Sequence, residues 1–136
     1  MSKSKKVSEC DSEILMNKVV EKVLENERYS HISYAMHQPL KLLIKDTSLL
    51  TQEEREYAKH PWTHTDFILF NKIDKSPILV VEVDGHGYHE NNEKQLRRDK
   101  LKDSILEKYN IEMIRLKTTG SEEYKLLEEK LEKVLS

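Results

Sequence analysis

The segment VVEVDGHGYHENNEKQLRRDK, residues 80–100, decides how the chain is interpreted. It begins as an apolar run that can fill a buried strand and then carries Glu82 and Asp84, separated by one residue. Because side chains alternate along a strand, Glu82 and Asp84 lie on one face and Val81 and Val83 on the other. Two carboxylates on one face of a buried strand repel each other unless a partner neutralises them. The segment therefore predicts a polar site at the end of a central strand.

The rest of the sequence predicts elements in the order helix, strand, strand, strand, helix, strand, helix. The expected helices are 12–24 with a Ser12 cap, a short insertion at 48–59 with a Thr51 to Glu54 capping box, 92–109, and 121–135 with a Ser121 cap. The expected strands are an edge segment at 32–44 that contains Pro39 and is open to a bulge, a hairpin of 65–70 and 77–83, and 111–116. A strand, a crossover helix and a further strand imply an α/β fold with a mixed four-stranded sheet flanked by helices.

Composition limits the number of domains and the class of protein. A chain of 136 residues can build one domain with a core, so we expect a flexible tail at 1–11 and a single domain at 12–136. No apolar run approaches the roughly 20 residues of a membrane span, and a single cysteine favours a reducing compartment, so we expect a cytoplasmic protein without membrane contacts. The net charge of -2 means that any nucleic-acid contact must come from a local basic patch.

Asp66 is the third acidic residue of the predicted site. It precedes the apolar run 67–70, and an antiparallel hairpin with the strand of Glu82 brings Asp66 to the same end of the sheet as Glu82 and Asp84. A hard divalent cation such as Mg²⁺ or Mn²⁺, bound by oxygen ligands, is the usual way to neutralise such a cluster. The alternative for Asp84 is a polar exit from the strand into a turn at Gly85.

The helix predicted after this segment has a mixed inner face. At about 100° per residue, one arc of about 140° collects four apolar and three polar side chains: Leu101, Ile105, Leu106, Tyr109, Gln95, Arg98 and Lys102. Arginine and lysine side chains that face the sheet need an anion to receive them, either the carboxylates or a phosphate. The alternative is that both side chains extend past the edge of the sheet into solvent.

The same residues carry a resemblance to a known family. Their order is Asp66, then Glu82-x-Asp84-Gly85-x-x-x-His89, then Gln95-x-x-Arg98-Asp99-x-x-Lys102, then the strand ending in Arg115. This order resembles the very-short-patch-repair-like branch of the PD-(D/E)XK nucleases. More narrowly, it is similar to the nuclease-like domains often attached to bacterial DNA helicases.

The resemblance implies metal-dependent hydrolysis of phosphodiester bonds on a restriction-endonuclease-like α-β-β-β-α-β core. Asp66 and Glu82 correspond to the acidic metal ligands of that family, and we add Asp84 to the expected metal-binding and catalytic set. The family pattern has a lysine two positions after the second acid, where this chain has Asp84. His89 or Lys102 is therefore expected to supply the function of the missing lysine.

Further residues are expected to assist catalysis or to bind nucleic acid. His89 can act as an acid or a base near neutral pH, because the ordinary pKa of histidine is about 6.5. Glu13 resembles an acidic residue that some relatives place near the metal; the alternative is a favourable charge in the first turn of a helix. Polar and basic residues of the predicted helix would contact the nucleic-acid backbone: Lys94, Gln95, Arg97 and Arg98.

We therefore expect an Mg²⁺-dependent endonuclease that acts on DNA, accessory to a helicase or to a repair or defence system. The main alternative is a nuclease-fold module that has lost activity and serves for nucleic-acid binding or docking. Zinc binding by His86 and His89 is a lesser alternative, because a glycine lies between them and they follow a strand. The remaining histidines lack the spacing of metal ligands and receive no role: His31, His37, His60 and His64.

Overall fold

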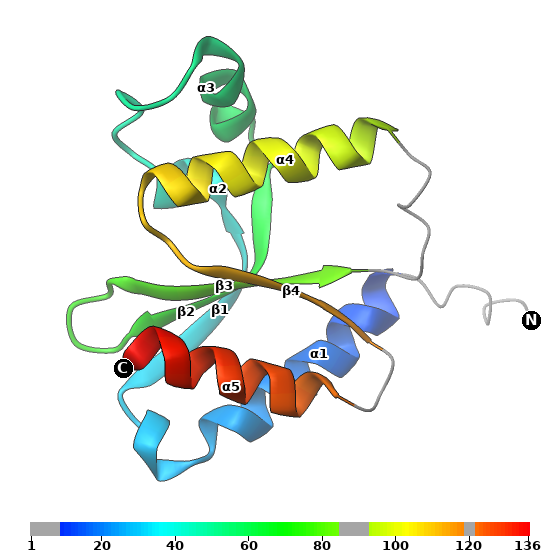
Figure 1. Ribbon diagram of the computed structural model, residues 1–136, viewed down its shortest axis with the longest axis vertical. Helices are drawn as coiled ribbons and strands as arrows, with labels where there is room; N and C mark the ends of the chain where they lie inside the picture. The colour runs from blue at the N-terminus through cyan, green and yellow to red at the C-terminus, as the bar shows by residue number, and fades with distance from the viewer. Residues whose placement is uncertain (1–8, 85–92, 119–121) are drawn as a thin grey trace, which may run out of the picture.

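A four-stranded mixed sheet separates two groups of helices (Figure 1). The computed structural model describes residues 9–84, 93–118 and 122–136. The strands are β1 Ile32–Pro39, β2 His64–Asn71, β3 Pro77–Asp84 and β4 Met113–Lys117. The helices are α1 Glu9–Leu24, the short 3₁₀ helix η2 Glu27–Tyr29, α2 Leu40–Leu43, α3 Gln52–Lys59, α4 Glu93–Lys108 and α5 Glu123–Leu135. The expected α/β class and the order of the core elements are confirmed.

Strand β3 lies in the interior of the sheet, as its apolar sequence predicts. The strand order is β1-β2-β3-β4, and β2 and β3 form an antiparallel hairpin in which Phe67 lies opposite Val81. Strands β3 and β4 are parallel, with Glu82 opposite Arg115. A parallel pair needs a long crossover, and helix α4 supplies it.

The first hydrophobic core lies between the sheet and the helices α1 and α5 (Figure 1). Phe67, Val81 and Val83 project into it from the sheet. Its fully buried side chains from the two helices are Met16, Val20, Val23, Leu127 and Leu131. Because β2 and β3 send alternate residues into this core, Asp66 and Glu82 belong to the opposite face.

The second core covers that opposite face and is built by α2, α3 and α4. Ile68 and Val80 of the sheet pack there against aliphatic side chains of the helices: Leu40, Ala58, Ile105 and Leu106. Asp66 and Glu82 are each two residues away from Ile68 and Val80 along their strands, so both carboxylates face the layer that contains α4.

Helix α1 begins earlier than expected, so the prediction that Ser12 caps it is wrong. The helix starts at Glu9, which places Ser12 inside it. Ser12 is buried, and its Oγ accepts a hydrogen bond from Oγ1 of Thr118 at 3.0 Å. Its role is therefore to tie α1 to the residue that follows β4. The expected Ser121 cap of α5 lies outside the described residues.

The edge segment 32–44 is extended only in its first part, so the prediction of a strand through residue 44 is wrong. Strand β1 ends at Pro39, which has no N–H to donate to a sheet, and the next residues form the short helix α2. No shift interrupts the register of β1 against β2; the irregularity of the sheet lies instead between Leu69 and Phe70, where β2 pairs with β3.

The capping box predicted at the start of α3 is confirmed, and it is part of a larger buried network. Thr51 and Glu54 exchange the two hydrogen bonds of the box. The Glu54 carboxylate also accepts hydrogen bonds from Lys108 at 2.5 Å and from Ser104 at 2.6 Å, both on α4. These hydrogen bonds lower the pKa of Glu54 from 4.5 to about 2, and the bond from Lys108 has the largest effect. The network fixes α3 against α4.

This network predicts a loss of stability in acid. Because the pKa of Glu54 is depressed in the folded state, the ionised carboxylate stabilises the protein above about pH 4.5, and this contribution is lost as the pH falls towards 2. We expect Glu54→Gln to lower the free energy of unfolding at pH 7 by about 1–3 kcal/mol. Urea unfolding at pH 7 and pH 3 should show the difference between parent and variant shrinking in acid.

Glu53→Gln is the matched control for this experiment. Glu53 is the preceding residue of the same helix, and its ion pair with Arg97 is exposed on both sides. An exposed pair contributes at most about 1 kcal/mol. Equal losses of stability in the two variants, or a Glu54→Gln effect that does not change with pH, would contradict the proposed importance of the network.

Candidate functional site

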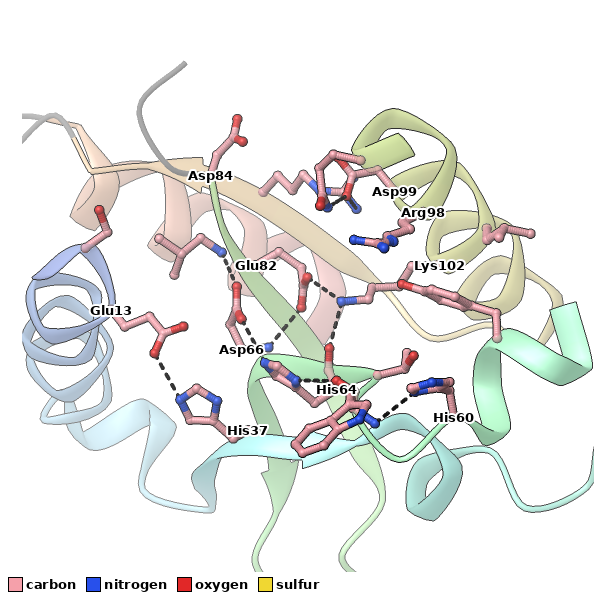
Figure 2. Close-up of a pocket in the computed structure, with 18 of the residues that line it drawn as sticks. Glu13, His37, His60, His64, Asp66, Glu82, Asp84, Arg98, Asp99 and Lys102 are labelled. Atoms are coloured by element: carbon pink, nitrogen blue, oxygen red, sulfur yellow. Dashed lines mark hydrogen bonds and ion pairs between the residues drawn. The ribbon is translucent and has the colours of Figure 1, made fainter. Parts of the chain in front are cut away.

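Asp66 and Glu82 meet where β2 and β3 come together beneath α4 (Figure 2). The backbone N–H of Asp66 donates to Oε2 of Glu82 at 3.0 Å, and the N–H of Val83 donates to Oδ2 of Asp66 at 2.8 Å. Each carboxylate thus binds the backbone of the neighbouring strand, beyond the last paired residues of the ladder, Phe67 and Val81. Contacts within the hairpin therefore position both carboxylates.

Lys102 of α4 completes this arrangement. Its Nζ lies 2.7 Å from Oε1 of Glu82 and 2.7 Å from the backbone oxygen of His64. Lys102 and Glu82 are both buried, and Figure 2 shows the lysine reaching from α4 towards β3. The side chain therefore faces the sheet, on the arc that the helix periodicity predicts, and it does not extend into solvent.

The buried charges at this site do not balance. Burial raises the pKa of both Asp66 and Glu82, and the proximity of Asp66 raises that of Glu82 further. Burial alone would lower the pKa of Lys102, but the ion pair with Glu82 holds it above its ordinary value. The ammonium of Lys102 binds Glu82 and not Asp66, so the two buried carboxylates outnumber the one buried ammonium group, and a further cation would relieve this excess.

These residues line an open cleft with a volume of about 1000 Å³. Most of the acidic side chains in the cleft are already paired. His37 Nε2 lies 2.9 Å from Oε1 of Glu13, and Arg115 lies 3.6 Å from Asp99. Arg98 also lines the cleft and extends from α4 in the direction of Lys102 (Figure 2).

Two histidines that sequence reasoning left without a role lie beside Asp66. His64 Nε2 is 3.6 Å from Oδ1 of Asp66, and its Nδ1 is 3.0 Å from the carbonyl oxygen of Trp62. His37 lies on β1 between Met36, which pairs with Phe67, and Gln38, which pairs with Thr65, and its ring centroid is 5.0 Å from that of His64. Its φ angle of 55° is in the left-handed region, which is uncommon for a residue other than glycine.

A signal for one of these histidines was present in the sequence. His64 precedes Asp66 by two residues, so in a strand the two side chains must share a face. His37 could not be found in this way, because its proximity to His64 and Asp66 depends on the register between β1 and β2.

The other predicted site residues are more dispersed. Asp84 lines the cleft, but its carboxylate points away from Asp66 and Glu82 (Figure 2). Gln95 donates a hydrogen bond to Asp99, Arg97 is paired with Glu53, and Lys94 is exposed. The expected catalytic residue His89 and the alternative zinc ligand His86 lie outside the described residues.

The donor set can be tested against the expected metal ion. Within residues 9–84, 93–118 and 122–136, no three His, Cys, Asp or Glu side chains are grouped as a metal site would group them. Asp66 and Glu82 nevertheless supply hard carboxylate oxygen donors, held on adjacent strands by backbone N–H groups. Mg²⁺ commonly binds one or two protein carboxylates and completes its shell with water and substrate phosphate. The pair of Asp66 and Glu82 therefore fits such an ion. Glu13, which was also expected to bind the metal, is paired with His37 instead.

The ion pair between Lys102 and Glu82 predicts a specific pattern of stability changes. Lys102→Met leaves a buried carboxylate without its partner, so we expect the free energy of unfolding to fall by about 3–5 kcal/mol. Adding Glu82→Gln should recover much of this loss, because the uncompensated charge is then gone. Urea unfolding of both single variants and the double variant measures the coupling. Strictly additive losses would show that the pair is not energetically coupled.

Comparison with known proteins places the chain in a family. In the described part of the chain, no helix is long and apolar enough to cross a membrane. No curated protein and no solved structure matches the chain. The family described as "Protein of unknown function (DUF2726)" matches residues 24–134, a range that includes Asp66, Glu82 and Lys102 but not Glu13. The match covers most of the sequence, so the chain belongs to this family.

Proposed function

We propose that this protein is a metal-dependent nuclease that hydrolyses phosphodiester bonds in DNA, in the manner of the very-short-patch-repair-like PD-(D/E)XK nucleases. One observation carries the proposal. Two buried carboxylates from adjacent strands and one lysine from the crossover helix meet in an open cleft and leave a net negative charge. A divalent cation would neutralise such a site, and it can both activate water and stabilise the charge that develops in phosphodiester hydrolysis.

Each residue of the site would have a separate role in hydrolysis. Asp66 and Glu82 would hold the metal ion, which supplies Lewis acidity and lowers the pKa of bound water. Lys102 fixes the orientation of Glu82 through its 2.7 Å bond and takes the place of the lysine missing from the strand. Arg98, which takes part in none of the ion pairs among the described residues, lines the cleft and would bind a phosphate there.

His64 is the described residue best placed to hold or release a proton. The carbonyl of Trp62 can only accept a hydrogen bond, so it requires the hydrogen of His64 to be on Nδ1. Nε2, on the side of Asp66, is then available to take up a proton. His64 thus offers the acid and base chemistry that was expected of His89.

The proposal includes a cellular setting. The resemblance to helicase-attached domains supports a cytoplasmic protein that assists a helicase or a repair or defence system. The second candidate, an inactive module for nucleic-acid binding or docking, is favoured by one observation: Lys102 already supplies a positive charge to Glu82. That ammonium binds Oε1 of Glu82, however, and the salt-bridge partner of Asp66 within the described residues is the imidazole of His64 at 3.6 Å, which carries a charge only when protonated. Asp66 is thus left open to a metal ion.

Asp66→Asn is the sharpest test of activity. Asparagine keeps an oxygen that can accept the N–H of Val83, but it removes the charge that a metal ion needs. We expect cleavage of DNA, assayed on both a single-stranded and a plasmid substrate with Mg²⁺ or Mn²⁺, to fall by at least about 100-fold, while stability stays the same or rises because a desolvated charge is lost. Asp74→Asn, in the loop at the other end of the hairpin, is the control and should cleave at the parent rate. An Asp66→Asn variant that matches this control would exclude the proposed site.

A second test asks whether Lys102 has the role of the missing strand lysine. At saturating metal and at a temperature where the variant is folded, Lys102→Met should lower turnover by at least about 100-fold. Lys100→Met changes an exposed lysine of the same helix and should retain turnover. Similar small losses in both variants would remove Lys102 from catalysis and leave the histidines as the candidates.

A further inference from the structure

Trp62 is an exposed aromatic residue in the wall of the cleft. It is the only tryptophan of the chain, and 80% of its surface is accessible. It lines the same cleft as Asp66, Glu82 and Lys102. A tryptophan side chain is usually highly buried, because its large apolar surface is costly to hydrate. Its position beside the carboxylates therefore indicates a surface that a flat, apolar ligand group can cover.

The turn that carries Trp62 is held in place by several hydrogen bonds. The N–H of Trp62 donates to Nδ1 of His60 at 3.2 Å, and its carbonyl accepts from Nδ1 of His64 at 3.0 Å. The N–H of Thr63 donates to the carbonyl of His60, and the N–H of Leu40 donates to the carbonyl of Thr63. The backbone that presents the indole is thus fixed from both sides, which lowers the entropic cost of using it as a binding platform.

The charges of the cleft do not favour a DNA duplex. A duplex is bound chiefly through phosphates, which requires several free lysine and arginine side chains. Within the described residues, Lys102 is bound to Glu82, Arg97 to Glu53, and Arg115 to two aspartates. Arg98 also lines the cleft and takes part in none of these ion pairs. The cations of the cleft itself can therefore neutralise few phosphates, so contacts of another kind must contribute to affinity.

Base stacking on an aromatic side chain is such a contact, and it is available only to an unpaired base. We propose that the substrate of the site is single-stranded DNA, and that Trp62 stacks on one of its bases while Arg98 binds the backbone. This inference rests on the proposed nuclease function and specifies its substrate. It accounts for an exposed indole, a fixed turn and a cleft with few free cations beside the carboxylates.

The fluorescence of the single tryptophan tests the inference directly. The full chain is titrated in EDTA with a single-stranded oligonucleotide of mixed sequence and with the duplex of the same sequence. We expect the single strand to quench Trp62, because stacking brings a base against the indole, and to bind at least about fivefold more tightly than the duplex. A duplex that binds equally well, or binding without a change in fluorescence, would overturn the proposal.

Variants separate stacking from other effects of substitution. Anisotropy of a labelled single strand should show affinity reduced by at least about fivefold in Trp62→Ala and retained in Trp62→Phe. Ile73→Ala removes a side chain that is 85% exposed in the loop between β2 and β3, and it should bind like the parent. Unchanged affinity in Trp62→Ala would also overturn the proposal, as would tighter binding of single-stranded RNA. Because EDTA prevents metal-dependent cleavage, a protein that binds as expected but never cleaves would contradict only the nuclease function.

Discussion

The reciprocal contacts between Asp66 and Glu82, completed by Lys102, are the constraint on which the site depends. Each carboxylate binds the backbone of the opposite strand, and the ammonium joins the pair to α4. The same three residues therefore hold the end of the hairpin, attach the crossover helix and create the excess charge of the cleft. Structural and chemical roles cannot be separated here, because the desolvation that raises the pKa values of the acids also strengthens their attraction for a cation.

The topology of the sheet explains why these residues meet. A hairpin brings Asp66 to Glu82, and a parallel pairing of β3 with β4 forces the chain to cross the sheet through α4. Lys102 of α4 then lies over the polar end of β3, and the next turn of the helix lies over the second core, where Ile105 and Leu106 are buried. A helix whose inner face carries Lys102 one turn before this aliphatic pair matches this division.

The periodicity of the sequence was enough to predict the hairpin, the interior position of β3 and the inward direction of Lys102. It was not enough for features that depend on contacts between distant segments. His37 lies next to His64 only because of the register between β1 and β2, and Ser12 looked like a cap although it is buried against Thr118. The short helix α2 was missed because its apolar residues also suit a strand, and only the end of the sheet at Pro39 decides between the two.

The central claim is that Asp66 and Glu82 form a site for a divalent cation. Isothermal titration calorimetry of Mn²⁺ into the protein without DNA measures this without any assay of cleavage. We expect one ion per chain in the parent protein and loss of this binding in Asp66→Asn, with the folded state of both confirmed by circular dichroism. Mn²⁺ binding of the same stoichiometry and affinity in the two proteins, or no binding to the parent, would contradict the claim.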